Sequence, residues 1–99
     1  MSEATSDVQI DNGEVRVTRW TLATGQSTGP HRHEYDYVVV PMAPGRMHLV
    51  NADGTQTHAD LEPGSAYYRA AGAEHTVSND DEAVVDFVEV EVLRPRPSS

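Results

Sequence analysis

Apolar residues in this chain occur in short alternating runs, and no stretch of a dozen residues repeats them at helical spacing. Alternation of apolar and polar side chains is typical of a strand with one buried face. Turn-forming Gly, Pro, Asn and Asp separate the runs at intervals of roughly eight to twelve residues. This pattern predicts an all-β sandwich or barrel of about seven or eight short strands. The expected strands cover residues 15–22, 37–42, 46–50, 55–61, 65–68, 75–78 and 84–93.

Two of these strands carry apolar residues on both faces. In 84–93, the four even-numbered valines share one face, while Val85 and Phe87 share the other. In 15–22 the apolar positions change phase near Arg19, which predicts a slip in that strand. A strand of this kind fits either a closed core or an outer face that a second chain covers, and we expect a homodimer.

The length of 99 residues allows one domain. We expect a loose tail over 1–7 within an N-terminal segment 1–12 that includes a first short strand. A barrel over 13–93 and a flexible, Pro-rich tail over 94–99 would follow. Inside the barrel, the pair Asp53-Gly54 predicts a tight hairpin turn.

Charge and composition narrow the possible partners. Seven basic residues against sixteen acidic ones give a net charge of −9, which disfavours nucleic acid and anionic membranes. The sequence has no Cys, so that a metal must be held by nitrogen and oxygen ligands. It shows no secretory signal and no apolar run of membrane-spanning length, and we expect a cytoplasmic protein.

The chemistry centres on the pair His31-x-His33, which follows a Gly/Pro turn. On a strand these two imidazoles point the same way and could clamp a transition metal. His75 can approach them from a different strand, and three neutral imidazoles would leave about three positions of an octahedral ion open. Tyr37 has the parity of the two histidines, which predicts that its phenol also faces inward.

Two segments resemble the paired motifs of the cupin superfamily. The first runs from Gly25 through His31 and His33, and the second runs from Gly64 through Gly72, His75 and Asn79. The likeness covers roughly residues 13–92 and is strongest to the small single-domain cupins of the β-alanine degradation group. It implies a double-stranded β-helix, or jelly-roll barrel, that is often dimeric and commonly binds iron, manganese, nickel or zinc. The histidines of the two motifs fall on His31, His33 and His75, and the usual Asn falls on Asn79.

One departure from the motif changes the expected chemistry. The first motif usually ends in a metal-binding Glu, but this chain has Tyr37 and Val38 there, which resembles the three-His cupins. Without that carboxylate the full divalent charge remains, and the site should favour an anionic, chelating substrate. Tyr37 would then orient or protonate an oxygen, in preference to the rarer alternative of binding the metal as phenolate.

Other candidate side chains have less specific readings. His48 and His58 sit in no motif; His48 could line the pocket, but we do not expect it to bind the metal directly. Tyr35, Tyr67 and Tyr68 should pack, with one of them reaching the cavity, and Trp20 should lie in the core. Arg69 is expected in a surface ion pair, with a substrate carboxylate as the alternative.

The sequence therefore favours a metal-binding cupin and leaves its activity open. One hypothesis is an enzyme, a three-His dioxygenase that acts on a small anionic metabolite, with Fe(II) as the favoured metal and zinc, nickel or manganese as alternatives. The other is a non-catalytic module that binds a small molecule or a metal, as a sensor or accessory protein. A purely structural barrel is disfavoured by the three histidines.

Overall fold

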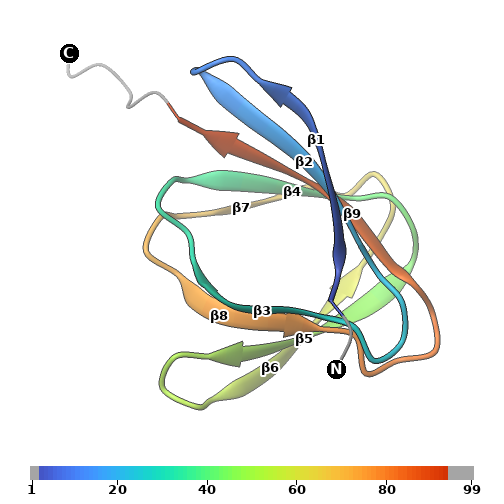
Figure 1. The fold of residues 1–99 in the computed structure, drawn as a ribbon. Helices are drawn as coiled ribbons and strands as arrows, with labels where there is room; N and C mark the ends of the chain where they lie inside the picture. The colour runs from blue at the N-terminus through green and yellow to red at the C-terminus, as the bar shows by residue number, and fades with distance from the viewer. Residues whose placement is uncertain (1–2, 94–99) are drawn as a thin grey trace.

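A computed structural model describes residues 3–93 and contains nine strands and no helix within that range (Figure 1). The expected tail over 94–99 lies outside the described residues. The strands are β1 (Thr5–Asp11), β2 (Val15–Leu22), β3 (Ser27–Arg32), β4 (Tyr37–Pro41), β5 (Gly45–Asn51), β6 (Gln56–Leu61), β7 (Tyr67–Arg69), β8 (Glu74–Ser78) and β9 (Val85–Val92). The prediction of an all-β chain is confirmed.

Two antiparallel sheets face each other as a jelly roll (Figure 1). One has the strand order β1-β2-β9-β4-β7, and the other has the order β3-β8-β5-β6. Consecutive strands often lie in different sheets, so that the chain crosses repeatedly between the two layers. The described residues contain no helix long and apolar enough to cross a membrane.

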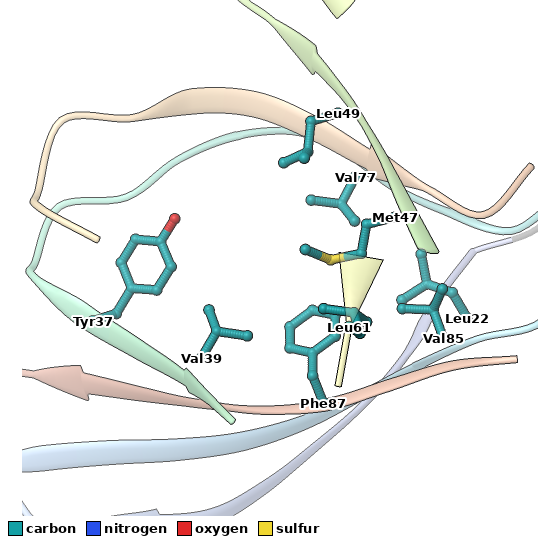
Figure 2. Packing of buried hydrophobic residues seen from close by; sticks show 9 residues of the cluster. All are labelled: Leu22, Tyr37, Val39, Met47, Leu49, Leu61, Val77, Val85 and Phe87. Carbon is teal, nitrogen blue, oxygen red and sulfur yellow. The ribbon is translucent and has the colours of Figure 1, made fainter. Parts of the chain in front are cut away.

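The core lies between the sheets and is built from the inward positions of their strands (Figure 2). On β9 the buried apolar side chains are Val85 and Phe87, as the alternation predicted, and β4 contributes Tyr37 and Val39. Burying side chains of this size stabilises a fold by about 1.5–3 kcal/mol each. The complete buried cluster is Leu22, Tyr37, Val39, Met47, Leu49, Leu61, Val77, Val85 and Phe87.

Two local predictions are wrong. The loose tail was expected to extend to residue 7, but β1 begins at Thr5 and pairs with β2 as an exposed edge strand. The expected slip near Arg19 is absent, because β2 and β9 pair in one continuous register from Val15 to Leu22. The apparent change of phase arises because Val15 and Val17 lie on the outer face of the sheet, whereas Thr18 and Leu22 are buried on the inner face.

The predicted turns hold the strands that carry the histidines. Gly54 adopts a φ of +86° in the β5–β6 hairpin, where its amide donates to the carbonyl of Asn51. Gly72 has a φ of +102° in the turn before β8, and its amide donates to the carbonyl of His33. Side chains with a Cβ disfavour these dihedrals, which explains the choice of glycine.

Asn79 joins the loops at the far end of β8 from His75. Its side chain is 1% exposed, and its Nδ2 donates to the carbonyls of Leu22 (2.9 Å) and Ala83 (2.8 Å). Its Oδ1 accepts from the amide of Asp81 at 2.9 Å. A buried amide with each polar atom paired fixes local geometry, because leaving one of them unpaired costs about 1–3 kcal/mol. The residue on which the second motif ends therefore has a structural role.

Candidate metal centre

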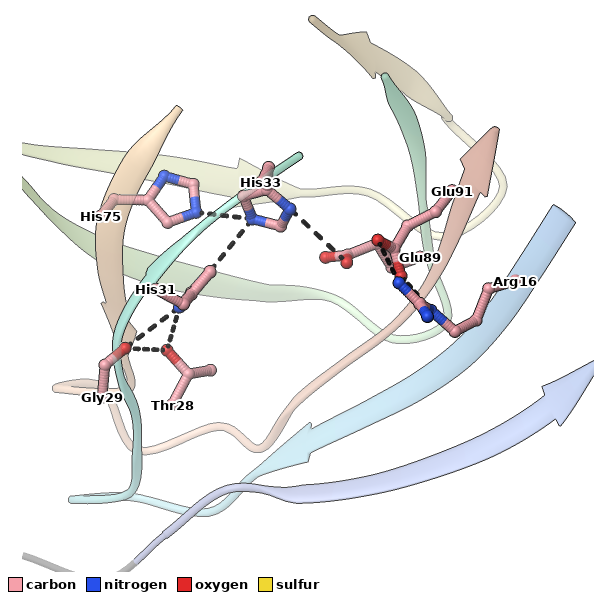
Figure 3. A network of polar contacts seen from close by, with 8 residues as sticks. All are labelled: Arg16, Thr28, Gly29, His31, His33, His75, Glu89 and Glu91. Atoms are coloured by element: carbon pink, nitrogen blue, oxygen red, sulfur yellow. Dashed lines mark hydrogen bonds and ion pairs between the residues drawn. The ribbon is translucent and has the colours of Figure 1, made fainter. Parts of the chain in front are cut away.

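Three histidine side chains meet at the mouth of the barrel (Figure 3). His31 lies on β3 directly opposite His75 on β8, and His33 follows β3 by one residue. The extended pairing continues past β3, because the amide of His33 donates to the carbonyl of Ala73 at 2.9 Å. His31 and His33 therefore keep the same facing, as predicted.

The Nε2 atoms of the three rings converge on one point. The Nε2 of His33 lies 3.0 Å from that of His31 and 3.1 Å from that of His75. In a metal site with nitrogen ligands about 2.1 Å from the ion, cis ligands are separated by about 3 Å. These two distances therefore match the spacing of neighbouring imidazole ligands on one ion, with His33 between His31 and His75.

The tautomer of His31 is fixed by the polar groups that contact its Nδ1. Its Nδ1 lies 3.1 Å from the carbonyl oxygen of Gly29 and 3.2 Å from the hydroxyl of Thr28. Because a carbonyl oxygen only accepts, Nδ1 carries the proton and donates to it, which leaves the Nε2 lone pair facing the other histidines. Histidines that bind metals are typically oriented in this way.

Burial keeps the other two rings in their neutral form. Together with the neighbouring His31, it lowers the pKa of His33 to about 4. Burial, with His31, His33 and Arg69 nearby, also lowers the pKa of His75 to about 4. Neutral imidazole is the form that binds a metal, so the site is poised for one at neutral pH.

Tyr37 faces inward, as its parity predicted, but from the opposite sheet. The chain crosses between the sheets at residues 33–36, and the ring of Tyr37 then stacks on that of His33, with centroids 4.0 Å apart and an interplanar angle of 20°. Burial and the nearby Glu89 raise the pKa of Tyr37 to about 12. Its phenol is therefore protonated and able to donate at neutral pH.

Two carboxylates from β9 belong to the site although the sequence pattern did not single them out. Glu89 and Glu91 continue the inward face that begins with Val85 and Phe87, and an Oε1 of Glu89 lies 3.8 Å from the Nδ1 of His33. Burial and the adjacent Glu91 raise the pKa of Glu89 to about 7. Glu91 forms a two-pronged ion pair with Arg16 at 2.9 and 3.1 Å (Figure 3). If the alternation of β9 is continued beyond Phe87, it places both carboxylates on the inward face of the strand.

A cavity of about 210 Å³ opens beside the histidines. Its apolar lining includes Val39, Leu49 and Phe87 from the core. Trp20 and Tyr67 also line it, which confirms that one of the three tyrosines reaches the cavity. The lining residues are Trp20, Thr28, His31, Arg32, His33, Tyr37, Val39, Met47, Leu49, Tyr67, Arg69, His75, Val77, Phe87, Glu89 and Glu91.

Arg69 differs from its predicted place in a surface ion pair. It lines the cavity, and its guanidinium carbon lies 5.5 Å from the centroid of the Tyr67 ring. The pair places a cation at the wall of a pocket that also contains the histidine triad. His48 and His58 lie elsewhere, on β5 and β6, and do not line this cavity.

Comparisons with known proteins agree with this architecture. Residues 18–91 match the family model described as a cupin domain. The β-alanine degradation protein BauB of Pseudomonas aeruginosa is 49% identical over 90 residues, which cover 91% of this chain and 94% of the relative. A crystal structure of a cupin domain from Bordetella pertussis Tohama I has a TM-score of 0.86 at 43% identity, covering 92% of this chain and 94% of that one.

A more distant structure shows the same fold. The RmlC-like cupin family protein of Methanocaldococcus jannaschii, described as a double-stranded β-helix, aligns with a TM-score of 0.76 at 15% identity. The alignment covers 90% of this chain and 79% of that one. The predicted double-stranded β-helix is confirmed.

Proposed function

This chain belongs to the cupin family, and on that basis we propose that it binds a divalent transition metal at His31, His33 and His75. The observation that supports this most directly is the convergence of three Nε2 atoms, with the proton of His31 held on the opposite nitrogen by Gly29. A cation between the rings would be bound by the lone pair of the His31 Nε2 and by the Nε2 atoms of His33 and His75 beside it.

Fe(II) is the metal that we favour. Zinc, nickel or manganese are alternatives, because imidazole ligands suit several of these ions. When bound, such an ion would supply a Lewis acid with open coordination positions. Glu89, behind His33, would orient the ring. Its carboxyl group faces Nδ1, and it is therefore a positioning residue rather than a ligand.

The second part of the proposal is a small anionic ligand in the cavity. Arg69 lies at its wall, and the acidic side chains nearby oppose an anion little, because Glu91 is paired with Arg16 and burial raises the pKa of Glu89 to about 7. The volume of about 210 Å³ suits a short metabolite. The Pseudomonas relative is named for degradation of β-alanine, which carries a carboxylate, so a short aliphatic carboxylate fits this class.

Tyr37 is the catalytic residue of this proposal. Its protonated phenol would donate a hydrogen bond or a proton to a substrate oxygen, while its ring holds His33 in place by stacking. The activity would be oxidation of the anion by O₂, with the metal as cofactor. The alternative is a cytoplasmic module that binds the anion or the metal without turnover.

Oxygen uptake separates the two functions. Protein loaded with Fe(II) is supplied with a panel of small carboxylates, diketones and hydroxybenzoates, and O₂ consumption is followed with an electrode. Consumption that depends on substrate and is lost in His75→Ala supports the enzyme. Ligand binding without any O₂ consumption supports the binding module.

Metal content tests the site itself. Elemental analysis of the purified protein should find a transition metal in the wild type and less of it, by the ion that the triad binds, in His31→Ala and His75→Ala. An unchanged metal content in both variants would refute the assignment of the triad.

A second copy of the chain is the partner that we propose. The outer face of the five-stranded sheet carries the even-numbered valines of β9 beside Val15 and Val17 of β2. At its margins Ile10, Tyr68 and Val92 are 47%, 60% and 43% exposed. Isologous pairing of two such faces would remove this apolar surface from water.

A further inference from the structure

A second group of potential metal ligands lies on the other sheet, away from the cavity. His48 on β5 is directly opposite His58 on β6, and their rings stack with centroids 4.8 Å apart at 21°. Asp80 reaches them from the loop that follows β8, the neighbour of β5 on its other side (Figure 1). One side chain from each of two strands and one from a loop thus meet on the outer face of the four-stranded sheet.

The ligand atoms are close enough to share an ion. The Oδ2 of Asp80 lies 3.1 Å from the Nε2 of His58 and 3.8 Å from the Nδ1 of His48. A tetrahedral ion with bonds of about 2.0–2.1 Å separates its ligands by about 3.3 Å. Both distances are within half an ångström or so of that value, which small side-chain rotations would accommodate.

The outward-facing nitrogen of His48 is already held. Its Nε2 lies 2.9 Å from the Oε1 of Gln56, which can only accept, and Nε2 therefore carries the proton. The lone pair is then on Nδ1, the atom that faces Asp80, where the hydroxyl of Ser78 also lies at 3.3 Å. A ring held through its second nitrogen by a polar neighbour is the usual arrangement of a histidine ligand.

From this geometry we propose that His48, His58 and Asp80 form a second metal site, separate from the triad. Two imidazoles and one carboxylate select ions such as Zn²⁺, Ni²⁺ or Cu²⁺ over Mg²⁺ and Ca²⁺. The side chains of His48, His58 and Asp80 are 17%, 36% and 51% exposed, so the ion can enter from solvent and keep a water ligand.

The proposed ion would act as a clamp. β6 is an edge strand of its sheet, and Asp80 belongs to the loop between β8 and β9. An ion bound to both would join the edge to the interior of the fold, and it would stabilise the native state by mass action because the unfolded chain does not hold the three ligands together.

The test counts Zn²⁺ per chain by equilibrium dialysis and elemental analysis. We expect two ions in the wild type, one in His58→Gln, one in Asp80→Asn and one in His31→Ala/His75→Ala. Combining the triad changes with His58→Gln should remove both ions. The matched control is Asp60→Asn, which removes an exposed carboxylate from the same strand, paired with Arg46 instead, and should leave two.

Thermal unfolding in the triad-less background provides an independent readout. There, micromolar Zn²⁺ should raise the Tm of His31→Ala/His75→Ala, and His58→Gln or Asp80→Asn should abolish that rise. If both substitutions leave the Zn²⁺ stoichiometry and the Tm rise unchanged, the second site does not exist and the cluster is an ion pair between His58 and Asp80. Because these measurements use protein that lacks the triad, their outcome does not depend on the proposed function.

Discussion

His31 and His75 face each other across the β3–β8 ladder, 44 residues apart in number, with ring centroids 4.7 Å apart at 81°. Their cross-strand register brings the two motif segments together, and His33 joins them because the extended pairing continues past β3 through Gly72 and Ala73. The geometry of the triad therefore follows from the register of one strand pair. Changes at its members, and at the residues behind them, should have separable effects.

Tyr37 should show two roles that different substitutions separate. Tyr37→Phe keeps the ring that stacks on His33, and we expect unchanged metal content with turnover or anion affinity reduced about 100-fold, the scale of a lost proton donor. Tyr37→Ala should also cost about 3–5 kcal/mol of the free energy of unfolding, because it empties a buried site. Kinetics and denaturant unfolding measure the two effects.

Tyr67→Phe is the control for that prediction, since Tyr67 lines the same cavity from β7. It should change turnover less than Tyr37→Phe does. Equal losses in the two variants would contradict the special role of Tyr37.

Glu89→Gln should weaken metal binding about 10–100-fold, the usual effect of removing a carboxylate behind a histidine ligand. Competition with a chelator measures this affinity. Glu91→Gln is the matched control, because Glu91 pairs with Arg16 rather than with His33, and its effect should be much smaller. An unaltered affinity in Glu89→Gln would show that the carboxylate does not support the site.

The stability of the metal-free protein should depend on pH through opposing groups. The native pKa values of His33 and His75, about 4, lie below the ordinary value of 6.5, so the unfolded state binds more protons between these pH values. Their contribution to stability is therefore present at neutral pH and is lost as the pH falls from 6.5 toward 4.

Glu89 acts in the opposite direction. Its native pKa of about 7 lies above the ordinary 4.5, so its contribution is present at low pH and is lost as the pH rises from 4.5 to 7. Removing it with Glu89→Gln should make stability rise more steeply between pH 4.5 and 6.5 than in the wild type. Urea unfolding across this range measures the slope, and a shallower slope in the variant would contradict the assignment.

Light scattering should report a particle of twice the 10.8 kDa chain at micromolar concentration. Val90→Lys places a charge on the outer face of the central strand β9 and should shift the equilibrium to the monomer. A monomeric wild type at that concentration would argue against pairing through this face.

Much of the fold follows from the sequence because each strand is short and its alternation is local. The inward faces of β4 and β9 are read from Tyr37, Val39, Val85 and Phe87 alone. The outer valines of β2 misled the same reasoning, since an apolar outer face looks like a slip when the sheet partner is unknown.

The site was predictable where parity or a motif determined it, and less so where tertiary structure did. Tyr37 was correctly placed inside although it lies on the opposite sheet from His33, because the two sheets share one interior. Glu89 was missed because a charged residue in a valine-rich strand is expected to face solvent. His48 and His58 flank the Asp53-Gly54 hairpin symmetrically, but only the fold brings Asp80 to them.

Anomalous scattering from crystals grown with Fe(II) or Zn²⁺ tests the central claim most directly. We expect a metal peak within bonding distance of the Nε2 atoms of His31, His33 and His75, and no such peak in His75→Ala. The absence of a peak between the three rings at saturating metal would contradict it.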